Sequence, residues 1–459
     1  MFSLDDTITA IATPAGTGGV GIVKISGDQA LPIIQKIFHP KAKSGRLKPR
    51  YLHFGFIQNP RTQHPIDEAL VAYMPGPHSY TGQDVVEIQA HSGAVPLQQI
   101  LQLILTEGAR AAEAGEMTLR AFLNGRLDLA QAEAVLDIIH AKTEAGLRIA
   151  TSQLNGGLSN KISDTRQKLV NALAYIEATI DFIEEDIPLE DITPTLQDAI
   201  DALQALASTA SQGVIYRQGV RAAIVGKPNV GKSSLLNALL RGERAIVTDI
   251  PGTTRDTLEE TINLDGIPFI LVDTAGIRAE PSDAVEEIGI NRSRAALNQA
   301  DLALMVVDLS QGITAVDLEI SQLIEGKPTV LILNKIDLKT DTTSFHISDD
   351  FLPNAPRLQL SALKLEGVED LENQLKIMIM GGEVVTTDNA MISNPRHQAL
   401  LVQAIDHTQS AIEAQQVNLS PDLISIDVRE AVDALGAITG ENASEDLLNT
   451  IFSKFCIGK

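Results

Sequence analysis

The sequence has a single cysteine and no long apolar run. Cys456 is the only cysteine among 459 residues, which rules out an internal disulfide and favours a reducing compartment. No segment approaches the roughly 18 consecutive apolar residues of a membrane span. The first ten residues, MFSLDDTITA, lack the charged and apolar regions of a signal peptide. We therefore expect a cytoplasmic protein without a membrane segment.

Positive charge is scarce as well. The chain has 36 lysines and arginines against 59 aspartates and glutamates, which gives a formal net charge of −23. This balance argues against a protein that coats nucleic acid through a general positive field. Any contact with RNA would need a local basic patch, or a partner that supplies one.

The length and the apolar pattern predict three kinds of region, and the helical kind occurs twice, the second time at the C-terminal end of the sequence. Residues 1–119 show short alternating strands and a helix, which indicates an α+β domain. Residues 120–217 show apolar residues at three- and four-residue spacing, which predicts helices. Residues 218–382 alternate apolar strands with helices, as in a parallel sheet covered on both faces, and helices return over 383–459. We expect an α/β domain inserted into a discontinuous α-helical domain, preceded by the α+β domain.

The apolar pattern also places individual elements. In the α+β region we expect strands at 7–13, 21–25, 66–73 and 85–89 and a helix at 94–105. In the helical regions we expect helices at 129–154, 161–183, 196–210, 397–416, 424–439 and 444–455. In the α/β region we expect strands at 220–225, 269–273, 303–308, 329–334 and 357–362. Gly16, Gly18 and Gly21 match G-x-G-x-x-G, but a strand follows them, so we interpret them as a strand connection.

Residues 226–233, GKPNVGKS, fit the phosphate-loop pattern and have the strand before and the helix after that it requires. The glycines let backbone N–H groups turn toward a phosphate, and the helix adds a partial positive charge. Lys232 can reach the β- and γ-phosphates, and the Ser233 hydroxyl can hold Mg²⁺. The predicted contacts in this loop are Asn229, Val230, Gly231, Lys232, Ser233 and Ser234.

Further motifs follow in the order of a GTP-binding domain. DTAG at 273–276 ends an apolar strand, where an acid can hold the magnesium shell through water and the Gly276 N–H can meet the γ-phosphate. In NKID at 334–337, the Asp337 carboxylate can accept two N–H groups of guanine, which selects guanine over adenine by about a hundredfold or more. The predicted contacts are Asp273, Thr274, Ala275, Gly276, Asn334, Lys335, Asp337 and, in the loop that backs the base, Ser361 and Ala362.

A switch loop is expected at TDIPGTTRD, where a threonine can complete the magnesium sphere. Its predicted contacts are Thr248, Asp249, Ile250, Pro251, Gly252, Thr253 and Thr254. Ras-like enzymes have a glutamine after the DTAG glycine to orient the attacking water. This chain has Ile277, which cannot do so, and nothing nearby resembles an arginine finger. Another group must position the water.

Together with GKPNVGKS, TDIPGTTRD, DTAG and NKID, the motifs ATPAGTGGVGIVKISG, SYTGQDVVEIQAHSG, RAFLNGRLDLAQAEAV and FCIGK extend the pattern beyond what GTPases share. With these motifs, essentially the whole chain resembles the MnmE (TrmE) family of tRNA-modification GTPases. The resemblance implies a homodimer through a folate-binding N-terminal domain. It also implies a flavoprotein partner, MnmG (GidA), in a heterotetramer that places a carboxymethylaminomethyl or aminomethyl group on the wobble uridine of certain tRNAs.

The resemblance implies site residues too. Hydrolysis would use K⁺ bound by Asn229, Thr248, Ile250 and Thr253, and Mg²⁺ held by Ser233 and Thr254. Glu286 would act on the water. Contacts to 5-formyl-tetrahydrofolate or another one-carbon tetrahydrofolate would come from Lys24, Glu87, Arg126 and Lys459, with Cys456 as a further catalytic candidate. Each has a simpler alternative, such as a solvated charge, or a small packed side chain for the cysteine.

Two classes of function remain open from the sequence. The first is an enzyme of tRNA modification in which GTP hydrolysis accompanies a folate-dependent step. The second is a GTPase switch in ribosome or RNA assembly, like the Era-type relatives of this domain. The acidic balance and the N- and C-terminal motifs favour the first, because a switch needs no folate site and usually adds a basic RNA-binding module.

Overall fold

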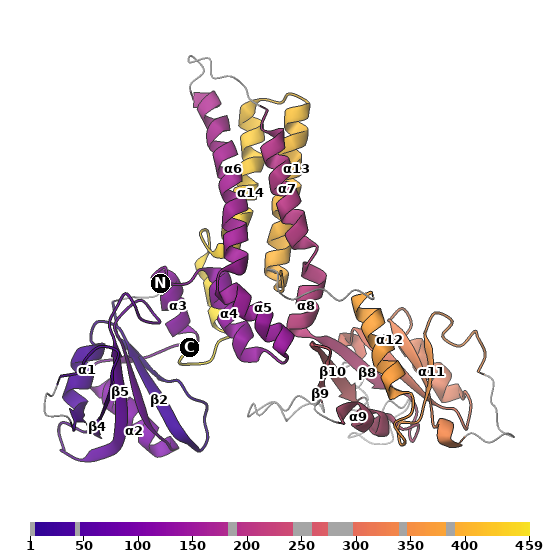
Figure 1. Cartoon of the computed structure of the whole chain (residues 1–459), viewed down its shortest axis with the longest axis horizontal. Coiled ribbons are helices and arrows are strands. Elements are labelled where there is room, and N and C mark those ends of the chain that lie inside the picture. Colours follow the sequence, from indigo (N-terminus) through magenta and orange to yellow (C-terminus); the bar gives the residue numbers. More distant parts are fainter. Residues whose placement is uncertain are drawn as a thin grey trace. The chain divides into compact units, whose positions relative to one another are not determined.

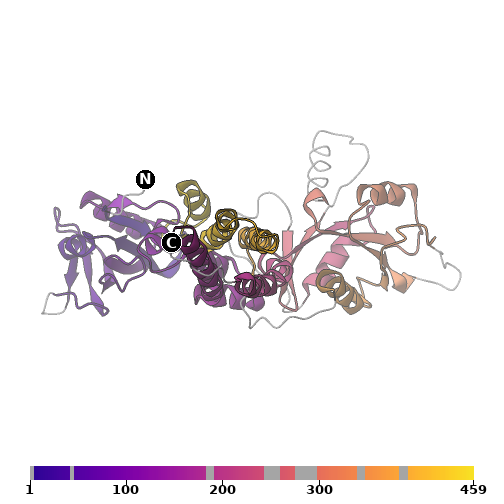
Figure 2. The same cartoon turned by 90° about the horizontal axis from the view of Figure 1, so that it is seen from above.

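The computed structural model of the chain describes residues 5–41, 46–181, 191–241, 259–273, 297–338, 347–381 and 391–459. The chain forms two compact units, each assembled from segments that are distant in sequence (Figures 1 and 2). One unit contains Met1–Ile139, Ser152–Leu203 and Leu400–Lys459, and the other contains His140–Thr151 and Gln204–Ala399. The domain boundaries expected at 120, 218 and 383 stay predictions.

The first unit begins with a mixed sheet in the strand order β3-β4-β5-β6-β2-β1-β7. Its strands are β1 (Ile8–Ile11), β2 (Gly18–Ser26), β3 (Phe38–Pro40), β4 (Leu52–Gln58), β5 (Pro65–Met74), β6 (Val85–Ser92) and β7 (Arg110–Ala111). β1 and β2 pair antiparallel, with Ile11 opposite Val23. Gly16 lies in the connection between these strands, as predicted, whereas Gly18 and Gly21 are already part of β2; a strand, and not a helix, follows the glycines.

Two helices cover one face of this sheet, α1 (Ala30–Ile37) and α2 (Ala94–Thr106). Ile34 of α1 and Ile100 of α2 share a buried core with Val23 and Ile88 of the sheet. The strands expected near 66–73 and 85–89 and the helix at 94–105 are confirmed, whereas α1 and β4 were not predicted. The helix α1 was not predicted because Pro32 lowers the helix propensity of this segment. Proline is nevertheless tolerated in the first turn of a helix.

Helices make up the rest of the first unit. They are α3 (Glu116–Leu123), α4 (Leu129–His140), α6 (Gly157–Asp181), α7 (Thr193–Ala207), α13 (Pro395–Gln416), α14 (Pro421–Thr439) and α15 (Glu445–Phe452). The four long helices α6, α7, α13 and α14 lie side by side in both views. Arg166 of α6 donates to the Val432 carbonyl of α14 at 3.3 Å and pairs with Glu441 at 2.7 Å. Segments more than 250 residues apart therefore form one helical layer.

The helix expected over 129–154 is wrong as one continuous element. It is divided into α4 and α5 (Glu144–Leu154) by residues 141–143. The Thr143 hydroxyl accepts a hydrogen bond from the Gly146 N–H at 3.2 Å and so begins the second helix. Similarly, α7 is followed by a separate α8 (Ala210–Gln218) before the next strand. Apolar spacing continues across these breaks, so periodicity alone did not reveal them.

The second unit is built on a sheet in the order β13-β12-β11-β8-β10-β9. Its elements are β8 (Val220–Val225), α9 (Lys232–Leu240), β9 (Glu259–Leu264), β10 (Ile267–Asp273), β11 (Leu302–Asp308), α11 (Ala315–Leu323), β12 (Thr329–Asn334), the 3₁₀ turn η3 (Ile336–Leu338), β13 (Arg357–Leu360) and α12 (Val368–Met380). The expected parallel pairings are confirmed for β8, β10, β11, β12 and β13. One further strand, β9, was not predicted; it joins the edge of the sheet antiparallel to β10.

Alternate residues of these strands enter two cores on opposite faces. Ile224 packs with Leu235 of α9 and Leu371 of α12, while Val225 packs with Ile320 of α11. This three-layer arrangement places the carboxyl ends of the parallel strands along one edge. Among the described residues, the segments that follow β8, β12 and β13 at that edge carry GKPNVGKS, NKID and Ser361-Ala362. Among the helices of the described residues, none is long and apolar enough to cross a bilayer.

Candidate functional site: a nucleotide loop and a cluster of cations

The phosphate loop leaves β8 and turns into α9. Asn229 and Gly231 both have left-handed backbone angles, with φ of 65° and 100°. A Cβ added at Gly231 would lie 2.3 Å from the Asn334 side-chain nitrogen, so only glycine fits there. A loop with these backbone angles can present successive N–H groups to an anion, which the dipole at the start of α9 also favours.

Lys232, the first residue of α9, folds back across this loop. Its Nζ donates to the carbonyl oxygens of Gly226 at 2.8 Å and Lys227 at 3.0 Å. The ammonium therefore lies over the loop that is expected to hold phosphates, as the motif predicts. Ser233 follows it in the first turn of α9, a position from which a hydroxyl can serve as a magnesium ligand.

Asn334 joins the phosphate loop to the loop after β13. Its side-chain amide donates to the Val230 carbonyl at 2.8 Å and accepts from the Ala362 N–H at 3.0 Å. The residue is only 2% exposed, so both bonds form away from water. If the loops moved apart, the buried amide of Asn334 would lose a hydrogen-bond partner, which costs free energy. The asparagine therefore fixes the spacing of the two loops.

Lys335 ties the same region to β11. Its Nζ donates to the Asn229 carbonyl at 2.7 Å and to Asp308 Oδ2 at 2.7 Å. Burial acts to raise the pKa of Asp308, but its bonds to Lys335 and Ser310 outweigh that effect and hold the pKa below its ordinary value. The sequence analysis did not identify Asp308. Its signal was available, since it is the acid that ends the apolar strand ALMVVD.

Asp337 lies on η3 with its carboxylate oriented by the loop after β13. Ser361 Oγ donates to Asp337 Oδ1 at 2.7 Å. This bond, with smaller contributions from nearby lysines, holds the pKa of Asp337 below its ordinary value. The group is thus ionised at neutral pH and keeps lone pairs free to accept N–H donors from a base. The structure brings together the predicted residues of both loops.

Several predicted residues lie outside the described residues. They are the switch-loop set Thr248, Asp249, Ile250, Pro251, Gly252, Thr253 and Thr254, the DTAG residues Thr274, Ala275 and Gly276, and Glu286. Asp273 is the last residue of β10. The roles of all these residues stay predictions.

Two of the predicted folate contacts, Lys24 and Arg126, lie at one aromatic ring in the first unit. Lys24 of β2 pairs in register with Glu87 of β6, and their charged atoms, Nζ and Oε1, lie 3.6 Å apart. Lys24 Nζ is 5.7 Å from the centre of the Tyr80 ring, and Arg126 Cζ is 4.9 Å from the same centre. Tyr80 was not predicted, although it stands in the SYTGQD motif. Its hydroxyl shares a 2.9 Å hydrogen bond with Thr118, which fixes the ring.

Lys459 belongs to the same cluster. Burial lowers its pKa, and the positive charge of Lys24 lowers it further, while Glu87 and Cys456 act in the opposite direction. Lys24, Glu87 and Cys456 are therefore close enough to the terminal lysine to change its pKa. Lys24 from β2 and Arg126 from the loop after α3 thus lie at the Tyr80 ring, and Lys459 of the C-terminal tail lies near Lys24 and Glu87.

The C-terminal tail is held against the N-terminal sheet. Ile457 forms a β-bridge with Ala114, and the Gly115 N–H donates to the Cys456 carbonyl at 3.4 Å. Gly458 has a φ of 93°, and a Cβ there would lie 2.7 Å from the Ile11 carbonyl oxygen. Phe452 and Phe455 anchor the tail in a buried apolar cluster. Cys456 itself is exposed, so it is not the packed apolar side chain of the simpler alternative.

Arg120 supports the loop that carries Tyr80. It is 1% exposed, and it donates to Gln83 Oε1 at 3.0 Å and to Glu116 Oε1 at 3.0 Å. Gln83 in turn accepts from the Ser26 hydroxyl at 3.1 Å. A buried charge with these partners is costly to remove, because its partners would be left unpaired. The sequence analysis did not identify this residue.

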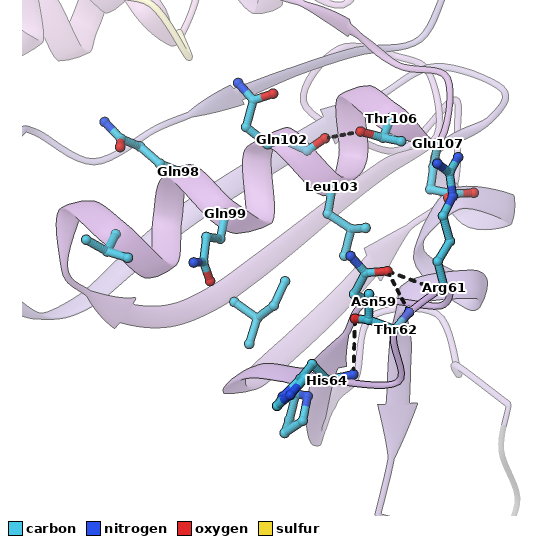
Figure 3. Close-up of a pocket in the computed structure, with 13 residues that line it drawn as sticks. Asn59, Arg61, Thr62, His64, Gln98, Gln99, Gln102, Leu103, Thr106 and Glu107 are labelled. Atoms are coloured by element: carbon cyan, nitrogen blue, oxygen red, sulfur yellow. Dashed lines mark hydrogen bonds between the residues drawn. The ribbon is translucent and has the colours of Figure 1, made fainter.

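A separate pocket of about 890 Å³ lies between α2 and the turn that joins β4 to β5 (Figure 3). Figure 3 shows Gln98, Gln99 and Gln102 of α2 on one side and Arg61 and His64 of the turn on the other. None of the predicted site residues lines this pocket.

The nucleotide loops meet at the carboxyl edge of a parallel sheet, where open α/β folds bind ligands. With a phosphate loop on one side and an oriented aspartate on the other, the second unit is a P-loop GTP-binding domain. A model of the MnmE helical domain matches residues 129–456, and a model of the GTP-binding protein TrmE N-terminus matches residues 7–126. The chain belongs to the MnmE family.

Relatives extend over the full length. The tRNA modification GTPase MnmE of Desulforamulus reducens is 46% identical over 461 residues, covering 99% of this chain and 100% of the relative. That of Roseiflexus sp. strain RS-1 is 48% identical, covering 99% of each chain. Among solved structures, Aquifex aeolicus Era bound to GDP.AlF4− is 29% identical over 41% of this chain and 66% of its own, with a TM-score of 0.30.

Proposed function

We propose that this chain is a K⁺-dependent GTPase of tRNA modification. It acts with the flavoprotein MnmG (GidA) to add a carboxymethylaminomethyl or aminomethyl group to the wobble uridine of certain tRNAs, using a one-carbon tetrahydrofolate. Full-length relatives named tRNA modification GTPase support the role in modification. The observation that carries the folate part is that Lys24, paired with Glu87, and Arg126 lie at the ring of Tyr80, with Lys459 near Lys24 and Glu87.

In the GTP site, the phosphate-loop residues bind and orient the nucleotide. Lys232 exchanges its carbonyl partners for the β- and γ-phosphates, while the N–H groups of the loop surround the phosphates. Asp337 recognises guanine, and Lys335, held along the phosphate loop, covers the base. The donor set at Ser233 and Thr254 suits Mg²⁺, whose chemistry there is to neutralise phosphate charge.

A bound K⁺ is proposed because this chain has Ile277, and not a glutamine, at the position where Ras-like enzymes orient the attacking water. Asn229 and the backbone and side-chain oxygens of Thr248, Ile250 and Thr253 form an oxygen-rich set suited to a hard monovalent cation. Its positive charge would take the place of an arginine finger. Glu286 is the acid we assign to the attacking water.

In the folate site, separated cations would bind the carboxylates of the folate tail. Lys24, Arg126 and Lys459 supply positive charge, and Glu87 can accept from ring N–H groups. A bound one-carbon tetrahydrofolate supplies the carbon that is transferred. Cys456, exposed on the anchored tail beside Lys459, is our candidate for a catalytic thiol.

We further propose a homodimer through the N-terminal domain, a heterotetramer with MnmG (GidA), and a cytoplasmic location. The alternative of a GTPase switch in ribosome or RNA assembly is disfavoured, because this chain matches the TrmE N-terminal and MnmE helical models and its full-length relatives are named tRNA modification GTPase.

The experiment that tests the proposal is calorimetric titration of the full chain with 5-formyl-tetrahydrofolate, with GTP turnover measured on the same preparation. We expect saturable folate binding and K⁺-stimulated turnover. GTP turnover without any folate binding would refute the folate part and revive the assembly switch.

A further inference from the structure

Asp308 is a buried carboxylate at the nucleotide edge of the sheet, and none of the nucleotide motifs assigns it a role. It is the last residue of β11 and only 1% exposed. Strand register places it opposite Asn334, the last residue of β12 and the first of the NKID motif. A charged side chain is rarely buried in this way unless it is paired. Its partners therefore indicate what it does.

Both carboxylate oxygens of Asp308 accept hydrogen bonds. Oδ1 accepts from the Ser310 N–H at 2.9 Å and from the Ser310 hydroxyl at 2.6 Å. Oδ2 accepts from Gln311 Nε2 at 3.1 Å and from Lys335 Nζ at 2.7 Å. The turn after β11 thus fixes the carboxylate, and one of its oxygens receives the lysine. Because this bond joins two charges and is largely shielded from water, it holds the ammonium in one place.

Lys335 reaches this oxygen from an unusual backbone conformation. Its φ is 68°, in the left-handed region, which is uncommon for residues other than glycine. Asn229 of the phosphate loop has a φ of 65°, and Lys335 Nζ donates to its carbonyl at 2.7 Å. Such conformations persist at functional sites where several contacts enforce them. One ammonium, held by Asp308, therefore connects two left-handed residues from separate loops.

The NKID motif holds two consecutive carbonyls of the phosphate loop. Lys335 donates to that of Asn229, and Asn334 Nδ2 donates to that of Val230 at 2.8 Å. The base loop and the phosphate loop are thus joined through two adjacent side chains. The lysine is the one that Asp308 anchors.

We propose that Asp308 is a positioning residue for nucleotide binding and hydrolysis. It holds the Lys335 ammonium so that the base loop and the phosphate loop, with Asn229, act as one unit. A lysine has three N–H donors, and the bonds to Asp308 and Asn229 leave one for the nucleotide. The effect on K⁺ rests on the proposed function, which assigns Asn229 to that cation.

Loss of the Asp308 charge should act on the lysine and not on recognition of the base edge. That edge is read by Asp337, which is oriented by Ser361. Asp308→Asn should therefore weaken binding of GDP and IDP by the same factor, about tenfold or more, since the bond that positions the lysine is lost. IDP lacks the exocyclic amino group of guanine, so loss of an edge contact would change the ratio of the two affinities.

The simpler alternative is that Asp308 only stabilises the fold. Its bonds to Ser310 would serve that purpose by ordering the turn after β11. A purely structural residue would lower the melting temperature, but its effect on nucleotide affinity would not depend on Lys335. A double-mutant cycle separates the two roles, because residues that act through one another are not additive.

The first test is calorimetric titration of the full chain with GDP in NaCl, without K⁺. The variants are Asp308→Asn, Lys335→Met and the two combined. We expect each single variant to lose about tenfold or more in affinity, and the double variant to bind within about twofold of Lys335→Met alone. If the two losses multiply, or if Asp308→Asn binds GDP like the parent chain, the proposal is overturned. A changed ratio of GDP to IDP affinity in Asp308→Asn would also overturn it.

Asp301→Asn is the matched control, because it makes the same change just before the other end of β11. Asp301 is exposed, accepts from the Arg221 N–H at 2.8 Å, and lies about 20 Å along the strand from the nucleotide edge. It should leave GDP affinity unchanged. Ser310→Ala keeps the carboxylate and removes one of its bonds, so it tests the same role if Asp308→Asn fails to fold. It should weaken GDP binding in the parent chain and not in the Lys335→Met background.

The second test concerns Asn229 and K⁺. The K⁺ concentration that gives half-maximal GTP turnover should rise severalfold in Asp308→Asn and stay at the parent value in Asp301→Asn, because Asn229 is held less firmly without the anchored lysine. An unchanged K⁺ requirement beside a lost GDP affinity would overturn the part that concerns Asn229. If the parent chain turns over GTP equally in KCl and NaCl, the K⁺ assignment of the proposed function fails, whereas the GDP cycle in NaCl still decides the role of Asp308.

Discussion

Asp337→Asn should change which nucleotide the P-loop domain prefers. The substitution preserves size but replaces one carboxylate oxygen with an NH₂ group. In the structure, Ser361 already donates to Oδ1 of Asp337, so the remaining lone pairs of the carboxylate are those available to guanine. The asparagine NH₂ would face an N–H donor of guanine and could not accept from it.

The magnitude follows from the number of bonds that are lost. Each bond to a charged acceptor contributes roughly ten- to a hundredfold in affinity. Losing one and weakening the other should reduce GTP affinity by about a hundredfold or more. Xanthine has a carbonyl where guanine has its exocyclic amino group, so the asparagine NH₂ can donate to it. Affinity for XTP should therefore rise.

Calorimetric titrations with GDP, GTP and XTP check this expectation. Asp370→Asn, an exposed acid of α12 in the same unit, is the matched control and should leave all three affinities unchanged. Equal GTP affinity for the parent chain and Asp337→Asn would refute the reasoning. The guanine contact would then have to come from another residue.

Four further outcomes test the remaining assignments. Turnover of GTP should be fast in KCl and slow in NaCl, and Asn229→Lys should abolish the difference because its ammonium competes with the cation; equal rates of the parent chain in both salts would contradict this. Glu286→Ala should slow hydrolysis while nucleotide affinity, measured by titration, stays near that of the parent; a large binding defect would make the residue structural. Removing the charge of Lys24 or Arg126 by substitution with alanine should weaken folate binding at least tenfold in calorimetry without a change in GTP turnover. Cys456→Ser should leave the melting temperature and K⁺-stimulated turnover unchanged but abolish modified wobble uridine in cells that carry only this variant, since the thiol is exposed and not part of the core; normal modification would remove the cysteine from the mechanism.

Much of the P-loop domain was predictable because its signals are local. Strands such as β12 are buried on both faces, so they appear in the sequence as continuous apolar runs, and the bounds of β12 are the expected ones. The phosphate loop and NKID are read from adjacent residues whose backbone forms the site. The antiparallel β9 was missed because the half-exposed EETINL has no such run.

The first unit shows where sequence patterns were insufficient. The break between α4 and α5 depends on one threonine cap inside an otherwise helical pattern. Tyr80 and Arg120 lie in motifs that the sequence analysis quoted, but no local pattern distinguishes them from their neighbours. Their importance comes from partners that are distant in sequence, such as Thr118 for the tyrosine and Gln83 for the arginine.

The sequence by itself determined the class of nucleotide, the order of the domains and the family, because motif chemistry resides in residues close together along the chain. Only the tertiary structure decided that Lys24, Glu87, Arg126 and Lys459 form one cluster. Strand register aligns the first two, and the apolar anchor of the tail brings in the last. Both depend on long-range packing, which has no periodic or local signature in the sequence.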